Sequence, residues 1–110
     1  MEKKVLKVVR SEQLLEDLAD IYQYGFETFG STTADFFLDE VHHSIRRLSS
    51  QYYLPSECRG LRTKSKKYRN IILGKYLIVY SITDERIEVL RALHGSRAPS
   101  LLRSVRNLKI

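Results

Sequence analysis

The chain has 110 residues, a length that fits one domain, and a formal net charge of +6 at pH 7. Apolar residues make up 43% of it and are spread along its length, which excludes an intrinsically disordered chain. A single cysteine, Cys58, excludes an internal disulfide, and we interpret it as an inert thiol in a loop of a protein from a reducing compartment.

No segment of the sequence predicts secretion or insertion into a membrane. Basic residues interrupt the first apolar residues, so a signal peptide is not expected. The longest apolar run, residues 76–80, is far shorter than the roughly 20 residues that a membrane-spanning helix needs. We therefore expect a cytoplasmic protein with no membrane partner.

Charge is divided unevenly along the chain. Residues 1–40 hold 4 basic and 9 acidic residues, whereas residues 41–110 hold 15 basic and 4 acidic residues. Seven basic residues and no acid lie between Arg59 and Tyr76. This distribution favours binding to a phosphate backbone or to an acidic protein, although a solvated surface that only maintains solubility would give the same pattern.

The N-terminal part of the chain predicts a strand followed by a helix. The segment of residues 5–9 is short and rich in β-branched side chains, which is typical of a strand. Ser11 can cap a helix over residues 12–29, where apolar residues recur at spacings of three and four, and Gly30 can end it. The acidic residues of this helix are expected on its polar face: Glu16, Asp17 and Asp20.

A second helix is expected over residues 33–49. Thr32 with Asp35 three residues later resembles a capping box, and apolar residues then recur at helical spacing. We interpret His42 and His43, which lie beside this apolar stripe, as structural or solvent-facing residues. Two helices joined by a short polar turn cannot bury both stripes alone, so the hairpin must pack on a sheet.

Three strands are expected after an irregular segment, over residues 68–73, 76–82 and 87–93. Gly74 starts the two-residue connection between the first two strands, as a type II′ hairpin requires, and Pro99 can begin a short helix. The predicted fold is α+β: a single domain with an N-terminal strand, a two-helix hairpin, a three-strand antiparallel meander and a short C-terminal helix. The hairpin covers one face of the sheet, and the other face is left partly open to basic side chains.

The meander contains a basic strand, an apolar strand that starts with Gly-Lys-Tyr, and a last strand that ends in His-Gly-Ser-Arg, at residues 68–71, 74–80 and 87–97. This combination resembles the RelE/ParE toxins of bacterial type II toxin–antitoxin systems, and the resemblance covers almost the whole chain. The last of these segments is nearer to the ParE-like members. The resemblance implies a toxin that inhibits growth or stabilises a plasmid, and that a cognate antitoxin neutralises.

The resemblance leaves two mechanisms open. ParE-like members bind and poison DNA gyrase, which is the mechanism we favour, whereas RelE-like members are metal-independent ribonucleases that cut messenger RNA on the ribosome. RelE-like members carry an arginine where this chain has Leu77, and a tyrosine near Leu101 or Leu102, so both groups are lost here. If the chain is a nuclease, His94 and Arg97 are the expected catalytic residues.

Basic residues predict the surface that contacts the target or a nucleic acid. No acidic or cysteine partner stands at ligand spacing from a histidine, so we predict no metal and no cofactor. The expected partners are the antitoxin and either DNA gyrase or the ribosome with its message, and the antitoxin complex is expected to bind operator DNA. A degenerate toxin that binds its antitoxin without arresting growth is a third alternative. The candidate binding residues are Lys64, Lys66, Lys67, Arg69 and Arg103.

Overall fold

The structure is a computed structural model that describes residues 4–108 and 110. It confirms the predicted α+β fold and the order of its elements, with the second helix longer at both ends than expected. In chain order the elements are β1 (Lys7–Arg10), α1 (Glu12–Phe29), α2 (Ser31–Gln51), the 3-10 helix η1 (Arg59–Leu61), β2 (Tyr68–Leu73), β3 (Tyr76–Ile82), β4 (Arg86–His94) and α3 (Ala98–Val105).

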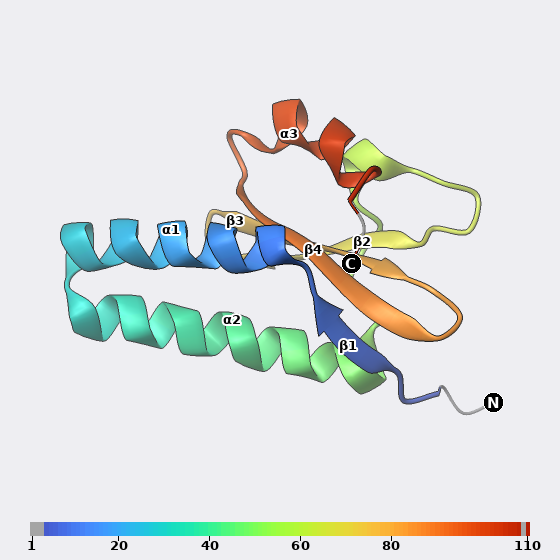
Figure 1. Ribbon diagram of the computed structural model, residues 1–110, viewed down its shortest axis with the longest axis horizontal. Helices are drawn as coiled ribbons and strands as arrows, with labels where there is room; N and C mark the ends of the chain where they lie inside the picture. The colour runs from blue at the N-terminus through green and yellow to red at the C-terminus, as the bar shows by residue number, and fades with distance from the viewer. Residues whose placement is uncertain (1–3, 109) are drawn as a thin grey trace.

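The four strands form one sheet in the order β1-β4-β3-β2. The meander β2-β3-β4 is antiparallel, as predicted, and β1 joins its β4 edge in parallel, with Lys7 opposite Arg86. A parallel pair needs a long crossover, and the two-helix hairpin begins that crossover on one face of the sheet. The free end of the hairpin projects beyond the sheet (Figure 1).

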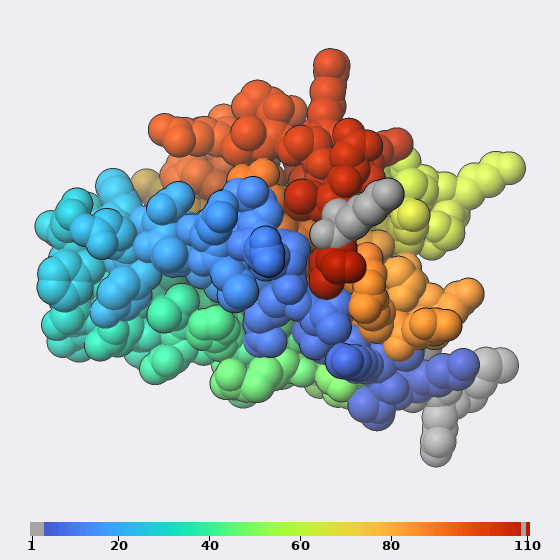
Figure 2. All heavy atoms as spheres, viewed as in Figure 1, coloured from blue at the N-terminus to red at the C-terminus, as the bar shows by residue number. Residues whose placement is uncertain are grey.

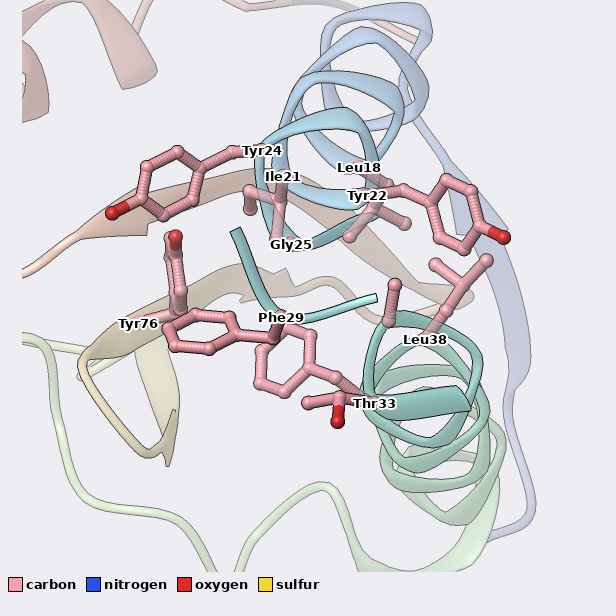
Figure 3. Close-up of a pocket in the computed structure, with 11 residues that line it drawn as sticks. Leu18, Ile21, Tyr22, Tyr24, Gly25, Phe29, Thr33, Leu38 and Tyr76 are labelled. Carbon is pink, nitrogen blue, oxygen red and sulfur yellow. The ribbon is translucent and has the colours of Figure 1, made fainter. Parts of the chain in front are cut away.

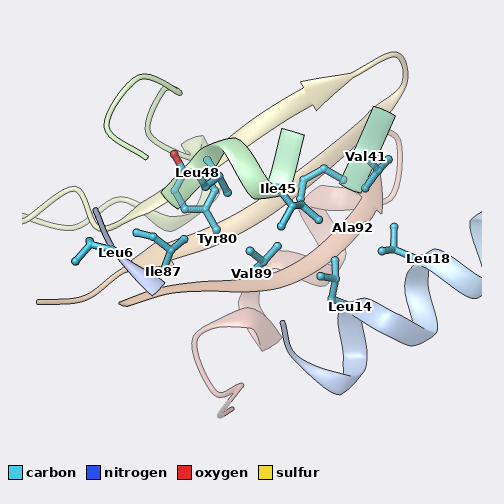
Figure 4. Close-up of a cluster of buried hydrophobic side chains, with 11 residues drawn as sticks. Leu6, Leu14, Leu18, Val41, Ile45, Leu48, Tyr80, Ile87, Val89 and Ala92 are labelled. Atoms are coloured by element: carbon cyan, nitrogen blue, oxygen red, sulfur yellow. The ribbon is translucent and has the colours of Figure 1, made fainter. Parts of the chain in front are cut away.

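The main core lies between this hairpin and the sheet (Figure 4). Because apolar residues recur every three or four positions in both helices, each helix turns one stripe toward the strands. Tyr80 is the largest of the completely buried side chains, and its hydroxyl donates to the carbonyl oxygen of Tyr52 at 2.6 Å. The buried residues of this core are Leu6, Leu14, Leu18, Val41, Ile45, Leu48, Ile78, Tyr80, Ile87, Val89 and Ala92.

A second core covers much of the opposite face of the sheet, so this face is less open than the partly open face that the sequence predicts. The helices η1 and α3 pack there, and α3 lies on the far side of the sheet from α2 (Figure 1). Cys58 is buried in this core, and burial raises the pKa of its thiol, which disfavours the reactive thiolate. Its buried residues are Cys58, Leu61, Tyr68, Val79, Leu90, Leu93, Ala98, Leu102 and Val105.

A β-bulge in β4 divides the strand between the two cores. Val89 and Arg91 pair with successive residues of β3, so Leu90 between them is one residue extra. Val89 and Ala92 both lie in the main core, whereas Leu90 lies in the second core. In a regular strand Arg91, rather than Ala92, would follow Val89 onto the main-core face. The bulge therefore removes a charged side chain from the position where it would enter the main core.

The predicted turns and caps are confirmed at three positions. The Ser11 side chain caps α1, and Gly30 ends that helix with a φ of 93°. Gly74 has a φ of 59°, whereas the described residues with positive φ do not include Lys75. A type II′ hairpin requires this combination, because only its first turn residue has a positive φ.

The predicted capping box at the start of α2 is wrong. Gly30 alone separates the two helices, so Ser31 and Thr32 are already helical and neither can adopt the extended conformation of an N-cap. Asp35 instead accepts a hydrogen bond from the hydroxyl of Tyr22 at 2.7 Å. The acid therefore ties α2 to α1 rather than capping its own helix.

Ser11 joins the start of α1 to the bulge of β4. Its Oγ accepts the backbone N–H of Leu14 at 2.9 Å and donates to the carbonyl oxygen of Leu90 at 2.7 Å. Its own backbone N–H donates to the carbonyl oxygen of Val89 at 3.0 Å. Since Ser11 is buried, these bonds satisfy polar groups that water cannot reach.

We predict that Ser11→Ala lowers the free energy of unfolding by about 1–2 kcal/mol, because both the helix cap and the partner of a buried carbonyl are lost. Urea unfolding followed by circular dichroism measures the change. Ser31→Ala is the matched control, because Ser31 is exposed and α2 has no side-chain cap bond. An equal loss in the two variants would contradict the role given to Ser11.

Candidate functional site

A groove runs between α1, the C-terminal end of β4 and the start of α3, with a cavity volume of about 680 Å³. In Figure 2 the orange-red residues of α3 lie along one side of the blue residues of α1. We call this feature the α1–β4 groove. Its lining residues are Asp17, Asp20, Ile21, Tyr24, Phe29, Phe37, Lys75, Tyr76, Arg91, Ala92, Leu93, His94, Ser96, Arg97 and Leu101.

The groove continues into a smaller apolar pocket of about 150 Å³ near the free end of the hairpin, which we call the tip pocket. Tyr24, Phe29 and Tyr76 gather on one side of it, and Tyr22 and Leu38 lie on the other (Figure 3). Tyr24 and Phe29 are 58% and 65% exposed, so much of their apolar surface faces solvent. The residues common to the groove and the tip pocket are Ile21, Tyr24, Phe29, Phe37 and Tyr76.

A buried ion pair forms part of the groove wall. The Arg91 Nε donates to Asp17 Oδ2 at 2.7 Å and its Nη2 donates to Oδ1 at 3.0 Å. The backbone N–H of Ala92 donates to the same Oδ2 at 3.0 Å. This bidentate geometry with a third donor compensates the carboxylate for the loss of water.

Asp17 corrects the expectation that the acids of α1 share its polar face. Glu16 and Asp20 are exposed, but Asp17 is buried against β4. The sequence did hold a signal for this, because Asp17 lies three residues after Leu14 and therefore on the buried stripe. An acid on the buried side of a helix needs a basic partner. The bulge in β4 places Arg91 where it can bind Asp17.

His94 lies at the end of β4 in a fixed orientation. Its ring contacts that of Tyr76 edge to face, with 5.4 Å between the ring centroids, and Tyr76 in turn contacts Phe37. The Nδ1 atom accepts the backbone N–H of Ser96 at 3.1 Å and lies 2.7 Å from the Ser96 hydroxyl. With Nδ1 as acceptor, the proton of the neutral ring is on Nε2.

The structure brings His94 and Arg97, the predicted catalytic pair, to the same groove. The turn between them is held by the backbone N–H of Arg97, which donates to the carbonyl oxygen of His94 at 2.9 Å. The Gly95 N–H donates to the carbonyl oxygen of Lys75 at 2.7 Å, which holds the same turn on the β2–β3 hairpin. Arg97 and Lys75 are exposed, so the groove presents two cations to solvent beside its aromatic lining.

The other predicted binding residues lie outside the groove. The Lys67 ammonium lies 5.2 Å from the centre of the Tyr68 ring. Arg69 has a structural role and does not point into an open face, because its guanidinium donates to the carbonyl oxygens of Tyr53 and Pro55 at 3.0 and 2.9 Å. The rest are exposed, on the loop before β2 or on α3: Lys64, Lys66, Lys67 and Arg103.

The basic residues of the sequence therefore do not converge on one surface. They are distributed among the groove, the loop before β2, α3 and other elements such as β1 and α2. The part of the chain that the structure describes contains no group of three or more His, Cys, Asp or Glu side chains arranged to hold a metal ion. Within residues 4–108 and 110, no helix is long and apolar enough to cross a membrane.

The fold is shared with a structure solved from a bacterial toxin–antitoxin system. A solved structure described as "Chromosomal ParDE TA system from P. aeruginosa" has this fold, with a TM-score of 0.68, 14% identity, and coverage of 82% of this chain and 96% of that chain. "Toxin ParE1" of Mycobacterium tuberculosis is 28% identical over 78 residues, which are 70% of this chain and 76% of the relative.

A family model described as "ParE toxin of type II toxin-antitoxin system, parDE" matches residues 8–99 of the chain. The chain therefore belongs to the ParE toxin family of type II toxin–antitoxin systems. This confirms the resemblance drawn from the β-meander and from the segment that ends at Arg97.

We predict that Asp17→Ala lowers the free energy of unfolding by about 3 kcal/mol, because Arg91, which is largely buried, is left without a partner for its charge. The double variant Asp17→Leu with Arg91→Leu should recover most of the loss, since no charge then remains in the wall. Glu16→Ala, at an exposed neighbouring position, is the control. Chemical denaturation of all variants checks this, and a double variant less stable than Asp17→Ala would contradict it.

Proposed function

We propose that this ParE family toxin arrests growth by binding DNA gyrase, without cutting RNA, and that it acts in the cytoplasm. One observation carries the proposal: the α1–β4 groove is lined by exposed aromatic rings, while its buried charges are already engaged inside the protein. Exposed apolar surface of this kind is typical of protein–protein contacts. The family membership supports a toxin in either mechanism, and the groove chemistry favours binding.

Cleavage of RNA would need a group to take the proton of a ribose hydroxyl and donors to stabilise the charge on phosphate. Leu77 packs against the second core and Leu101 lines the groove, so aliphatic side chains stand where a nuclease needs polar ones. The Arg91 fork is occupied by Asp17. His94 and Arg97 remain, and we assign them to target binding.

The same groove fits the antitoxin. An amphipathic acidic segment would place apolar side chains over the aromatic rings and tip pocket, and its carboxylates beside Lys75 and Arg97. The two partners would then compete for one surface, and the antitoxin would neutralise the toxin by occluding it. We include binding of the toxin–antitoxin complex to operator DNA in the proposal, with the exposed basic residues outside the groove as the contacts available to phosphate.

We expect induction of the wild-type toxin to block gyrase supercoiling and to leave messenger RNA intact. His94→Ala and Arg97→Ala should each weaken growth inhibition about ten-fold, the effect of losing one contact of roughly 1.4 kcal/mol. Exposed His43 on α2 provides the control His43→Ala. Supercoiling assays and primer extension on total RNA measure the two activities.

Cuts in translated messages that disappear in His94→Ala would overturn the gyrase mechanism and make His94 a general acid or base. If neither activity is found and the antitoxin still binds, the chain is a degenerate toxin.

We also predict that Tyr24→Ala and Phe29→Ala each reduce antitoxin affinity by about ten-fold or more, because buried aromatic anchors dominate such contacts. Phe36→Ala is the matched control, since Phe36 is 71% exposed on the same hairpin and lines neither the groove nor the tip pocket. Isothermal titration calorimetry measures the affinities. Binding of the antitoxin should also weaken as the salt concentration rises. Equal losses of affinity in the three variants would mean that the antitoxin binds elsewhere.

A further inference from the structure

A cluster of basic side chains lies where β1 ends against α2, and it shares no residue with the α1–β4 groove. Arg10 is the last residue of β1, and His42 and Arg46 are one helical turn apart on α2. The backbone N–H of Leu6 donates to the carbonyl oxygen of Ser49 at 2.9 Å, which holds β1 along this side of the helix. Secondary structure therefore fixes the three basic groups beside one another.

Arg10 is incompletely satisfied at this place. Its Nε atom is buried and has no hydrogen-bond partner among the described residues. Within the same part of the chain, the ion pairs join Arg86 to Glu88 and Arg91 to Asp17, so Arg10 and Arg46 are left without one. A buried guanidinium N–H without an acceptor costs free energy, unlike the exposed end of an ordinary surface arginine.

The charges of Arg10 and Arg46 dominate the electrostatics of the cluster, and they repel each other. Burial lowers the pKa of Arg10, and the charge of Arg46 lowers it further. Burial also lowers the pKa of His42, and Arg10 and Arg46 act in the same direction. Asp39, one turn before His42, opposes them. The neighbouring charges are therefore two arginines against one carboxylate, and an anion placed among them would relieve the repulsion.

We propose that Arg10, His42 and Arg46 form a binding site for a carboxylate group supplied by a protein partner. A guanidinium pairs with two carboxylate oxygens at once, and His42 can donate a further hydrogen bond. Arg46 is exposed and His42 and Arg10 are half-buried, so a side chain that approaches from solvent can reach Arg46 and His42 beside the buried Nε of Arg10.

A carboxylate fits this site better than a nucleic-acid backbone does. Residues 11–45, which form α1 and most of α2, hold eight acidic residues and no Lys or Arg. A strand of phosphates long enough to reach the cluster would place further negative charges along this acidic hairpin, and repulsion would oppose it. A partner protein can present a single acid and keep its other charges away.

The site should also respond to pH. A bound carboxylate stabilises protonated His42, so binding of the acid and of the proton favour each other. The affinity for the carboxylate should therefore rise as the pH falls through the pKa of His42. It should be lower at the higher pH values where His42 is neutral. Asp39, on the same helix, limits this effect because it already stabilises the protonated ring.

The test is a nuclear magnetic resonance titration of the His42 ring in the intact protein, at matched ionic strength in chloride. A short peptide that carries one glutamate and no other charge is the probe, and a single-stranded oligonucleotide of equal charge is the comparison. We expect the peptide to raise the pKa of His42. Arg10→Gln and Arg46→Gln should abolish that rise and weaken the site about ten-fold, as expected for one lost charge-assisted contact.

Arg47→Gln is the matched control, because Arg47 neighbours Arg46 but its guanidinium donates to Gln51 at 3.2 Å. It should keep the rise, and exposed Arg46 provides a test that does not depend on the folding of β1. An unchanged His42 pKa at saturating peptide, or a rise that survives Arg46→Gln, would overturn the proposal. A larger rise with the oligonucleotide would overturn the choice of a carboxylate and identify the ligand as phosphate.

Discussion

The ion pair between Asp17 and Arg91 determines where the helical hairpin lies on the sheet. Removing two charges from water is costly, and the cost is offset only if the geometry is good and the remaining lone pairs are satisfied. Here both guanidinium bonds and the Ala92 N–H meet one carboxylate. That arrangement requires the β4 bulge, because a regular strand would point Arg91 into the main core. The bulge, the pair and the position of α1 therefore depend on one another.

The α1–β4 groove exists because the sheet carries a separate core on each face. The main core holds α1 and α2, and the second core holds α3 and η1. Both β3 and β4 contribute to the two cores, and the C-terminal end of β4 emerges between the two layers with His94 at the boundary. The edge-to-face contact with Tyr76 and the bond from Ser96 then fix the ring. The aromatic residues of the hairpin extend this boundary beyond the sheet, toward the tip pocket.

Local patterns were enough to predict the elements, because spacings of three and four residues, a strand alternation and a glycine turn are each readable in a short window. The placement of His94 and Arg97 in one groove followed from the order of those elements. The β4 bulge could not be predicted from the sequence, because Val89 and Leu90 are adjacent apolar residues whichever faces of the sheet they occupy. The sequence also did not predict that η1 and α3 cover the second face of the sheet. Which surface a short helix packs on depends on contacts made far away in the sequence.

The parallel pairing of Lys7 with Arg86 also has a consequence for how the chain is made. When β1 and the hairpin first leave the ribosome, the strand they need has not emerged, and Asp17 has no arginine to bind. Contacts between residues so distant in sequence form slowly, because the intervening chain must first be ordered. The groove is therefore absent from the nascent toxin and appears only after β4 is complete. Translation thus creates an interval in which the cell holds the polypeptide but not its binding surface.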